Sequence, residues 1–159
     1  MNGATGRVVL AVSPDTPADA VEVAFNHAAQ QGLPLLAVRL WHDPDLSLGG
    51  WLRPNRIARW DAAHSDARRE LDSALARARV AHPEVEVATV VVDDDPVPFL
   101  AALSTRAELL VLGRPSRLGQ ASPVDALIHQ AACPILVVPR TRRPSNPLLA
   151  GTLTSTWGG

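Results

Sequence analysis

The strongest constraint in this sequence is a regular alternation of short, largely apolar runs with longer segments of helical spacing. Four runs have the length of a strand and few polar residues, at 8–12, 35–41, 109–113 and 134–138. Runs that are apolar on both faces are typical of buried strands in a parallel sheet. A fifth run, at 85–92, is interrupted by Glu86 and Thr89, and this pattern predicts an edge or half-exposed strand.

Three of the intervening helices are predicted to begin with a capping residue followed by proline, at Thr16-Pro17, Asp95-Pro96 and Ser122-Pro123. The side-chain oxygen of the first residue can cap the helix, and proline suits the first helical position because the N–H there has no intrahelical partner. The helix after Pro17 is predicted to end at Gly32, since glycine readily adopts the left-handed conformation of a helix end.

The longest helix is predicted over about 54–81. Its apolar residues form one stripe that we expect to face the core, consisting of Ile57, Trp60, Ala67, Leu71, Ala74, Leu75 and Ala78. Before it lies a loop rich in Asp, Pro and Gly that contains Trp51, a possible contact anchor.

Strands that alternate with helices predict a Rossmann-like α/β fold, with parallel strands, right-handed crossovers and helices on both faces of an open sheet. We expect one domain over 1–139. Residues 140–159 are rich in Arg, Pro, Ser, Thr and Gly without periodicity, which predicts a flexible tail. Ligands bind such sheets beyond the carboxyl ends of the strands, so the segments 13–17 and 113–122 are the first candidates for a site.

Composition excludes several classes of function. The formal net charge is -1, without the basic excess that a nucleic-acid-binding protein usually carries. No apolar segment approaches the roughly 20 residues of a membrane span. The single cysteine, Cys133, cannot form an internal disulfide, which favours a reducing, cytoplasmic location, and its place beside a buried strand predicts an inert thiol.

Catalytic and metal-binding patterns are not found in the sequence. The five histidines lack the paired spacing of a metal site, and neither a Walker lysine nor a Gly-x-Ser-x-Gly elbow occurs. We therefore predict a protein that is not an enzyme, with slow ATP hydrolysis left open.

Four segments together resemble universal stress proteins: the opening strand with its cap, the Asp95-Pro96 helix start, the strand Glu108–Gly113, and Ile128-His-Gln-Ala-Ala-Cys-Pro-Ile-Leu-Val-Val-Pro139. The resemblance covers about Arg7 to Pro139. It implies a five-stranded sheet ordered 3-2-1-4-5, a bacterial stress-survival role and a homodimer paired through the last strand, at Ile135 and Val137. Some members of that family bind ATP.

The nucleotide motif of the ATP-binding members is altered here. They carry Gly-x-x-Gly and then Gly-Ser or Gly-Thr after the fourth strand, where glycine lets the backbone approach phosphate. In this chain the first glycine is Gly113, the second falls on Ser116, and the final pair falls on Ala121-Ser122. The acidic residue that these members carry after the first strand corresponds to Ser13. ATP binding is therefore expected to be lost or weakened.

Three hypotheses remain open. The first is a non-catalytic, dimeric regulatory module of the stress-protein type. The second is an ATP or adenine-nucleotide sensor with a remodelled loop, in which Arg114 and Arg117 could hold an anion bidentately. Its candidate site consists of Val12, Ser13, Val38, Gly113, Arg114, Ser116, Arg117 and Ser122. The third is an assembly component that attaches to a larger protein through its tail and the Trp51 loop.

Overall fold

The computed structural model of the chain describes residues 6–41, 56–114 and 123–140. These ranges form alternating strands and helices in the order β1 (Val8–Val12), α1 (Ala18–Gln31), β2 (Leu35–Trp41), α3 (Arg56–Ala81), β3 (Val87–Asp93), α4 (Pro96–Ser104), β4 (Leu109–Gly113), α5 (Pro123–Gln130) and β5 (Ile135–Val138). None of the helices within these ranges combines the length and the apolar character that crossing a membrane requires.

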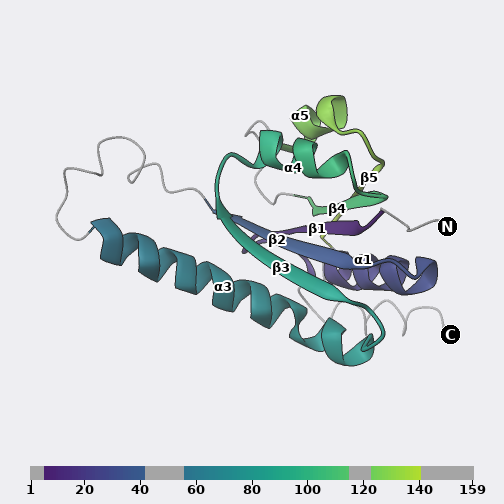
Figure 1. The fold of residues 1–159 in the computed structure, drawn as a ribbon, viewed down its shortest axis with the longest axis horizontal. Helices are drawn as coiled ribbons and strands as arrows, with labels where there is room; N and C mark the ends of the chain where they lie inside the picture. The colour runs from purple at the N-terminus through teal and green to yellow at the C-terminus, as the bar shows by residue number, and fades with distance from the viewer. Residues whose placement is uncertain (1–5, 42–55, 115–122, 141–159) are drawn as a thin grey trace, which may run out of the picture.

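The five strands form one parallel sheet in the order β3-β2-β1-β4-β5, which confirms the expected topology (Figure 1). The central strand β1 pairs with β2 on one side and with β4 on the other, with Val8 opposite both Leu35 and Leu109. The chain therefore reverses its direction of winding at β1. The crevice between the carboxyl ends of β1 and β4 is the place where sheets of this kind bind ligands.

Helices cover both faces of the sheet, as Figure 1 shows, with α1 and α3 on one face and α4 and α5 on the other. Alternate residues of β1 pack into two hydrophobic cores, one on each face of the sheet, because successive side chains of a strand point to opposite faces. Val8 and Leu10 pack in the cluster that contains Phe25 of α1 and Leu71 of α3. Val9 packs in the second cluster, on the α4 and α5 face. The prediction of buried strands is confirmed for β1, β2 and β4, whereas the edge strand β5 is only partly buried, with Leu136 38% exposed.

The predicted helix ends are confirmed at two places and wrong at one. Asp95 caps α4, since its Oδ1 accepts a hydrogen bond from the Val97 N–H at 3.2 Å, and Gly32 ends α1 in the left-handed conformation with φ 64°. Thr16 does not cap α1: Pro17 occupies the N-cap position without a side-chain cap. The Thr16 hydroxyl is used instead to close a turn with Ser13. Ser122 lies outside the described residues.

The predicted core stripe of the long helix is correct only in its second half. Ala67, Leu71, Leu75 and Ala78 are buried, whereas Ala74 is exposed, Ile57 is 78% exposed and Trp60 is 38% exposed. The reason is visible in Figure 1: the first turns of α3 extend past the carboxyl end of the sheet, so no core lies beneath them. Periodicity shows which residues share a helix face, but it does not show how far the sheet under that face extends.

The outer strands also differ from their predicted bounds. β3 alternates half-buried and exposed residues, which confirms a half-exposed edge strand, but it begins at Val87 and ends at Asp93. β5 begins at Ile135 because Pro134 has no N–H to donate, although its carbonyl accepts from Leu110 N at 3.0 Å.

Candidate functional site

A cavity of about 250 Å³ lies at the carboxyl edge of the sheet. It is bounded by the ends of β1, β2 and β4, by the segment after β1, and by the first parts of α4 and α5. Its described lining residues are Ala11, Val12, Ser13, Asp15, Thr16, Leu40, Trp41, Asp94, Pro96, Leu100, Leu112, Gly113, Arg114, Val124 and Leu127. The cavity is thus at the crevice that the winding of the sheet predicts.

The structure brings four of the candidate residues together in this lining: Val12, Ser13, Gly113 and Arg114. Val38 does not line the cavity. It lies on the same strand face as Leu40 but further from the strand end, and it is fully buried in the core on the α4 and α5 face. Ser116, Arg117 and Ser122 fall outside the described residues.

Sequence reasoning missed Leu40, Trp41 and Asp94 as lining residues. A signal for them was present, because all three lie at or directly after the carboxyl end of β2 or β3. The rule that ligands bind at the carboxyl ends of parallel strands applies to these strands as well as to β1 and β4.

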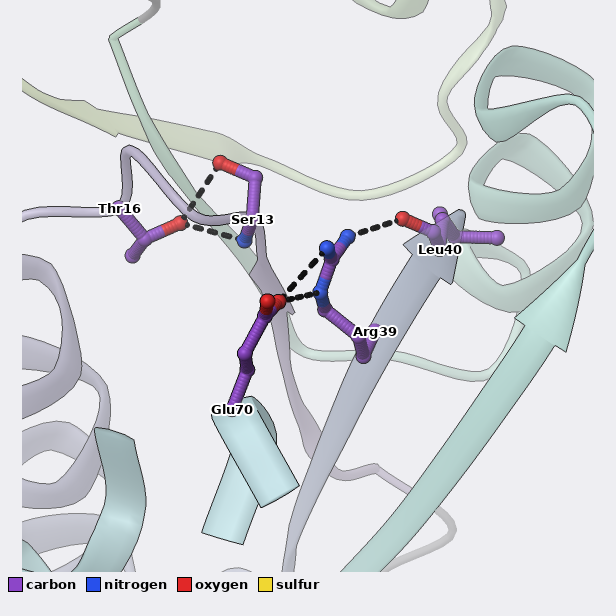
Figure 2. A network of polar contacts seen from close by, with 5 residues as sticks. All are labelled: Ser13, Thr16, Arg39, Leu40 and Glu70. Atoms are coloured by element: carbon purple, nitrogen blue, oxygen red, sulfur yellow. Dashed lines mark hydrogen bonds and ion pairs between the residues drawn. The ribbon is translucent and has the colours of Figure 1, made fainter. Parts of the chain in front are cut away.

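The segment after β1 is closed on itself by hydrogen bonds, as Figure 2 shows. The Ser13 backbone N–H donates to Thr16 Oγ1 at 2.7 Å, the two hydroxyls lie 3.2 Å apart, and the Thr16 N–H donates to the Ser13 carbonyl at 3.1 Å. Arg140 reaches the same segment, with Nη2 3.5 Å from Asp15 Oδ1. The backbone donors of Ser13 and Thr16 are therefore used within the protein.

Gly113 ends β4 at a point of close contact with the start of α1. A Cβ added to Gly113 would lie 2.6 Å from Pro17 Cδ and 3.3 Å from Thr16 Cα. The next residue, Arg114, donates its backbone N–H to the Val138 carbonyl at 2.9 Å. The space that glycine leaves is thus filled by the protein's own chain.

An ion pair ties α3 to the end of β2. The Arg39 side chain is buried under α3, and its Nε and Nη2 donate to Glu70 Oε2 at 3.2 and 2.9 Å (Figure 2). Its Nη1 donates to the carbonyl of Leu40, which lines the cavity. Arg39 therefore fixes the end of β2 against the helix. A single arginine in an otherwise apolar strand was the sequence signal for this contact.

Aromatic rings cluster beside the cavity. Trp60 stacks on His64 with ring centroids 5.0 Å apart, and Trp41 contacts Trp60 at 5.8 Å in a tilted arrangement. Trp60 Nε1 donates to Asp93 Oδ2 at 3.3 Å. Trp41 Nε1 is buried and has no hydrogen-bond partner in the described part of the chain. Trp41 belongs to both the cluster and the cavity wall.

Two further features bear on chemistry. Within the described ranges, no group of three or more His, Cys, Asp or Glu side chains is placed to hold a metal ion. Cys133 is half-buried, and burial raises the pKa of its thiol, while hydrogen bonds from the backbone of Cys133 and Leu110 oppose the shift. The thiolate that a reactive cysteine needs is therefore disfavoured.

The fold and the cavity define an open-sheet α/β domain of the Rossmann-like class with a crevice at the carboxyl edge of its sheet. A profile of the universal stress protein family matches residues 5–139, and the chain belongs to this family of stress-response proteins. A universal stress protein of Mycobacterium tuberculosis is 32% identical over 124 residues, which cover 74% of this chain and 40% of the relative. The chain thus spans about 40% of the length of the curated relatives it matches.

Solved structures agree on the fold. A universal stress family protein from Burkholderia pseudomallei is 27% identical, with a TM-score of 0.60, over 87% of this chain and all (100%) of that one. A universal stress protein in complex with cAMP is 18% identical, with a TM-score of 0.55, over 86% of this chain and 98% of that one. At 18% identity, the likeness to the protein in complex with cAMP shows that the two chains share a fold.

Proposed function

We propose that the chain is a non-catalytic regulatory module of the stress response whose binding of nucleotide phosphates is lost or weakened. The main support for this proposal is that the backbone groups around Gly113 already have contacts within the protein's own chain. Phosphate sites in these folds depend on free backbone N–H groups and on a glycine that phosphate can approach. Here the Ser13 and Arg114 N–H groups have partners within the chain, and Pro17 covers Gly113.

The charges of the side chains that line the cavity also disfavour the binding of nucleotide phosphates. Asp15 and Asp94 contribute two carboxylates to the lining, and Arg114 contributes one guanidinium. Like charges repel, so the carboxylates disfavour a triphosphate that carries several negative charges. Part of the effect of Asp15 is offset by Arg140, which pairs with it.

Calorimetric titration with ATP, with and without magnesium, tests the proposal. We expect no saturable heat at micromolar nucleotide and no rise in the unfolding temperature, since a ligand that binds only the folded state must raise it. Saturable ATP binding at low micromolar concentration would refute the proposed loss. A matched ATPase assay tests the non-catalytic part, and turnover above a heat-inactivated control would contradict it.

A second candidate is an adenine-nucleotide sensor that binds a ligand with fewer phosphates. It is favoured by the placement of Ser13, Gly113 and Arg114 around one cavity, and by the structural neighbour whose complex contains cAMP. Titration with cAMP tests it. If cAMP binds and Arg114→Ala lowers the affinity at least tenfold, this candidate gains support; an unchanged affinity removes it.

Two proposals concern partners. The edge strand β5 has β4 as its neighbour in the sheet, and Leu136 on it is 38% exposed, so a second copy can pair there through Ile135 and Val137. Light scattering after gel filtration tests this, and a monomer at every concentration would refute it.

The attachment of a larger protein through Trp51 and 140–159 involves residues outside the described ranges. Deletion of 140–159 should abolish capture of the partner while leaving the unfolding temperature unchanged.

A further inference from the structure

β3 is the last strand on one side of the sheet, and within the described ranges no strand lies beyond its outer edge (Figure 1). It pairs with β2 in continuous register over all seven of its residues, Val87–Asp93. The edge strand on the other side, β5, has four residues. The β3 edge is thus the longer of the two edges at which this sheet can accept a further strand.

One hydrogen bond fixes which backbone groups of β3 face outward. The Glu86 carbonyl accepts from the Leu35 N–H at 2.8 Å, so it points toward β2. The N–H and the C=O of one residue in a strand point to the same side, and successive residues alternate between the two sides. The N–H and C=O groups of Val87, Thr89 and Val91 therefore point away from the sheet. No other described residue forms a backbone hydrogen bond with them on that side.

The side chains of β3 leave this edge accessible. Residues 87–92 contain no charged residue and no proline, which are the usual means of protecting an open edge. Val87 and Val91 pack in the cluster of the α1 and α3 face, so Ala88 and Val90 lie on the opposite face. There Ala88 is exposed and Val90 is 36% exposed. An added strand would therefore meet apolar surface on this face.

A hollow lies beside the start of the same edge. It has a volume of about 230 Å³, and its described lining residues are Arg79, His82, Pro83, Val85 and Val87. Since Val87 also turns its N–H and C=O outward, a strand paired with it would place a side chain next to this hollow. The edge thus offers backbone partners, apolar surface and space for a side chain together.

Charges at the two ends of the edge decide which segment fits it. Exposed carboxylates flank β3 at its start and at its end, namely those of Glu84, Glu86, Asp93, Asp94 and Asp95. A second copy paired antiparallel to β3 would bring the acidic start of one strand against the acidic end of the other, and like charges on neighbouring strands are destabilising. Arg79 in the hollow partly offsets the charge at the start of β3. Basic residues of a partner are therefore best placed at the end of β3.

We propose that the open edge of β3 binds an extended segment of a partner protein as a sixth strand. The segment is antiparallel to β3, because antiparallel pairing is slightly more stable per residue. It is uncharged and β-branched at its centre and carries arginine or lysine at the end that meets Asp94 and Asp95. Main-chain hydrogen bonds to Val87, Thr89 and Val91 supply affinity, and the acidic end selects the basic partner. The inference goes beyond the proposed function and does not depend on whether the crevice holds phosphate.

The probe for the test is a peptide amide of the sequence Arg-Arg-Thr-Val-Thr-Val-Thr with an uncharged dye at its N-terminus. Its length matches β3, and antiparallel pairing places its arginines at the acidic end of the edge. We expect a saturable rise in dye anisotropy with the full chain, with a Kd below about 100 µM. The same peptide with glutamate in place of both arginines should bind at least about 10-fold more weakly. A peptide with N-methyl groups on its central amides cannot donate to the edge and should also lose at least about 10-fold in affinity.

Variants of the chain locate the binding surface. Thr89→Pro removes an outward N–H and leaves the ladder to β2 intact, so it should weaken binding by at least about 5-fold. Thr89→Val keeps the N–H, and as the matched control it should change the affinity by less than about 2-fold. Asp94→Asn combined with Asp95→Asn keeps the oxygens that accept from the Asp95 and Val97 N–H groups and removes two charges, which should weaken binding by at least about 3-fold. Asp125→Asn, at an exposed position of α5, is the control for charge and should leave the affinity unchanged.

Circular dichroism and the unfolding temperature show whether Thr89→Pro folds; if it does not, the N-methylated peptide tests the same hydrogen bonds on the unmodified chain. Absence of saturable binding, or equal binding of the N-methylated peptide, would overturn the inference.

Two other occupants of the edge would also overturn it. If Thr89→Pro converts a dimer of the chain into a monomer in light scattering, a second copy holds the edge. If a chain shortened after residue 143 binds the probe at least about 10-fold more tightly than the full chain, the chain's own tail holds it. Binding to the full chain that requires the Thr89 N–H and the charges of Asp94 and Asp95 supports the inference.

Discussion

Replacement of Gly113 by alanine tests whether the close contact between β4 and the start of α1 shapes the site. The added Cβ would lie 2.6 Å from Pro17 Cδ and 3.3 Å from Thr16 Cα, and neither atom is the end of a flexible side chain. Overpacking of this kind typically costs about 1–3 kcal/mol. Since φ is not positive at Gly113, alanine also stabilises by about 0.4–1 kcal/mol through the unfolded chain. We expect a net loss of about 1–2 kcal/mol.

Urea denaturation measures this loss, and a double-mutant cycle assigns its cause. Pro17→Ala removes the Cδ atom that the new Cβ would meet, so the double variant Gly113→Ala, Pro17→Ala should be more stable than the sum of the single changes predicts, by about 0.5–1 kcal/mol. The denaturant slope should stay constant, because the exposed surface on unfolding is unchanged. Equal or greater stability of Gly113→Ala, or strict additivity in the cycle, would refute the reasoning.

Three other predictions follow from single contacts. Asp95→Ala should lower the free energy of unfolding by about 1 kcal/mol, since it removes the cap of α4. Asp95→Asn, which keeps a capping oxygen and removes only the charge, should cost clearly less in the same denaturation series. Glu70→Ala should cost about 1–2 kcal/mol because Arg39 is buried, whereas Asp72→Ala on the exposed face of α3 should cost less than about 0.5 kcal/mol. Cys133 should react with iodoacetamide more slowly in the folded chain than in urea near pH 8, because its raised pKa lowers the thiolate fraction below that of an ordinary thiol; equal rates would contradict this.

Local patterns were sufficient for much of the fold. The strands β1, β2 and β4 are apolar enough to be recognised individually, and Asp95 and Gly32 mark helix ends through chemistry that acts within a few residues. The order of the strands came from the resemblance to universal stress proteins. The alternation of strands and helices required a parallel sheet but left the neighbours of each strand open.

Two of the errors have different causes: the first is local, and the second depends on distant parts of the chain. Thr16 has the chemistry of a helix cap, yet its hydroxyl closes the turn with Ser13, because Pro17 takes the N-cap position. Trp60 has helical spacing with the core residues of α3, yet it lies at the very end of the sheet, where it is 38% exposed and packs against Trp41 and His64. Spacing along one helix carries no information on the length of the sheet beneath it.

The sequence by itself determined the class of fold, the two faces of the sheet and the edge at which a ligand site should lie, because these follow from local periodicity and from the direction of parallel strands. Tertiary structure decided what that site offers. It placed Pro17 against Gly113, bound Arg39 to Glu70, and brought Trp41 and Asp94 into one wall. Such contacts join residues far apart in the chain. Their geometry is fixed by the packing of the whole sheet, and no single segment of the sequence contains the information that determines it.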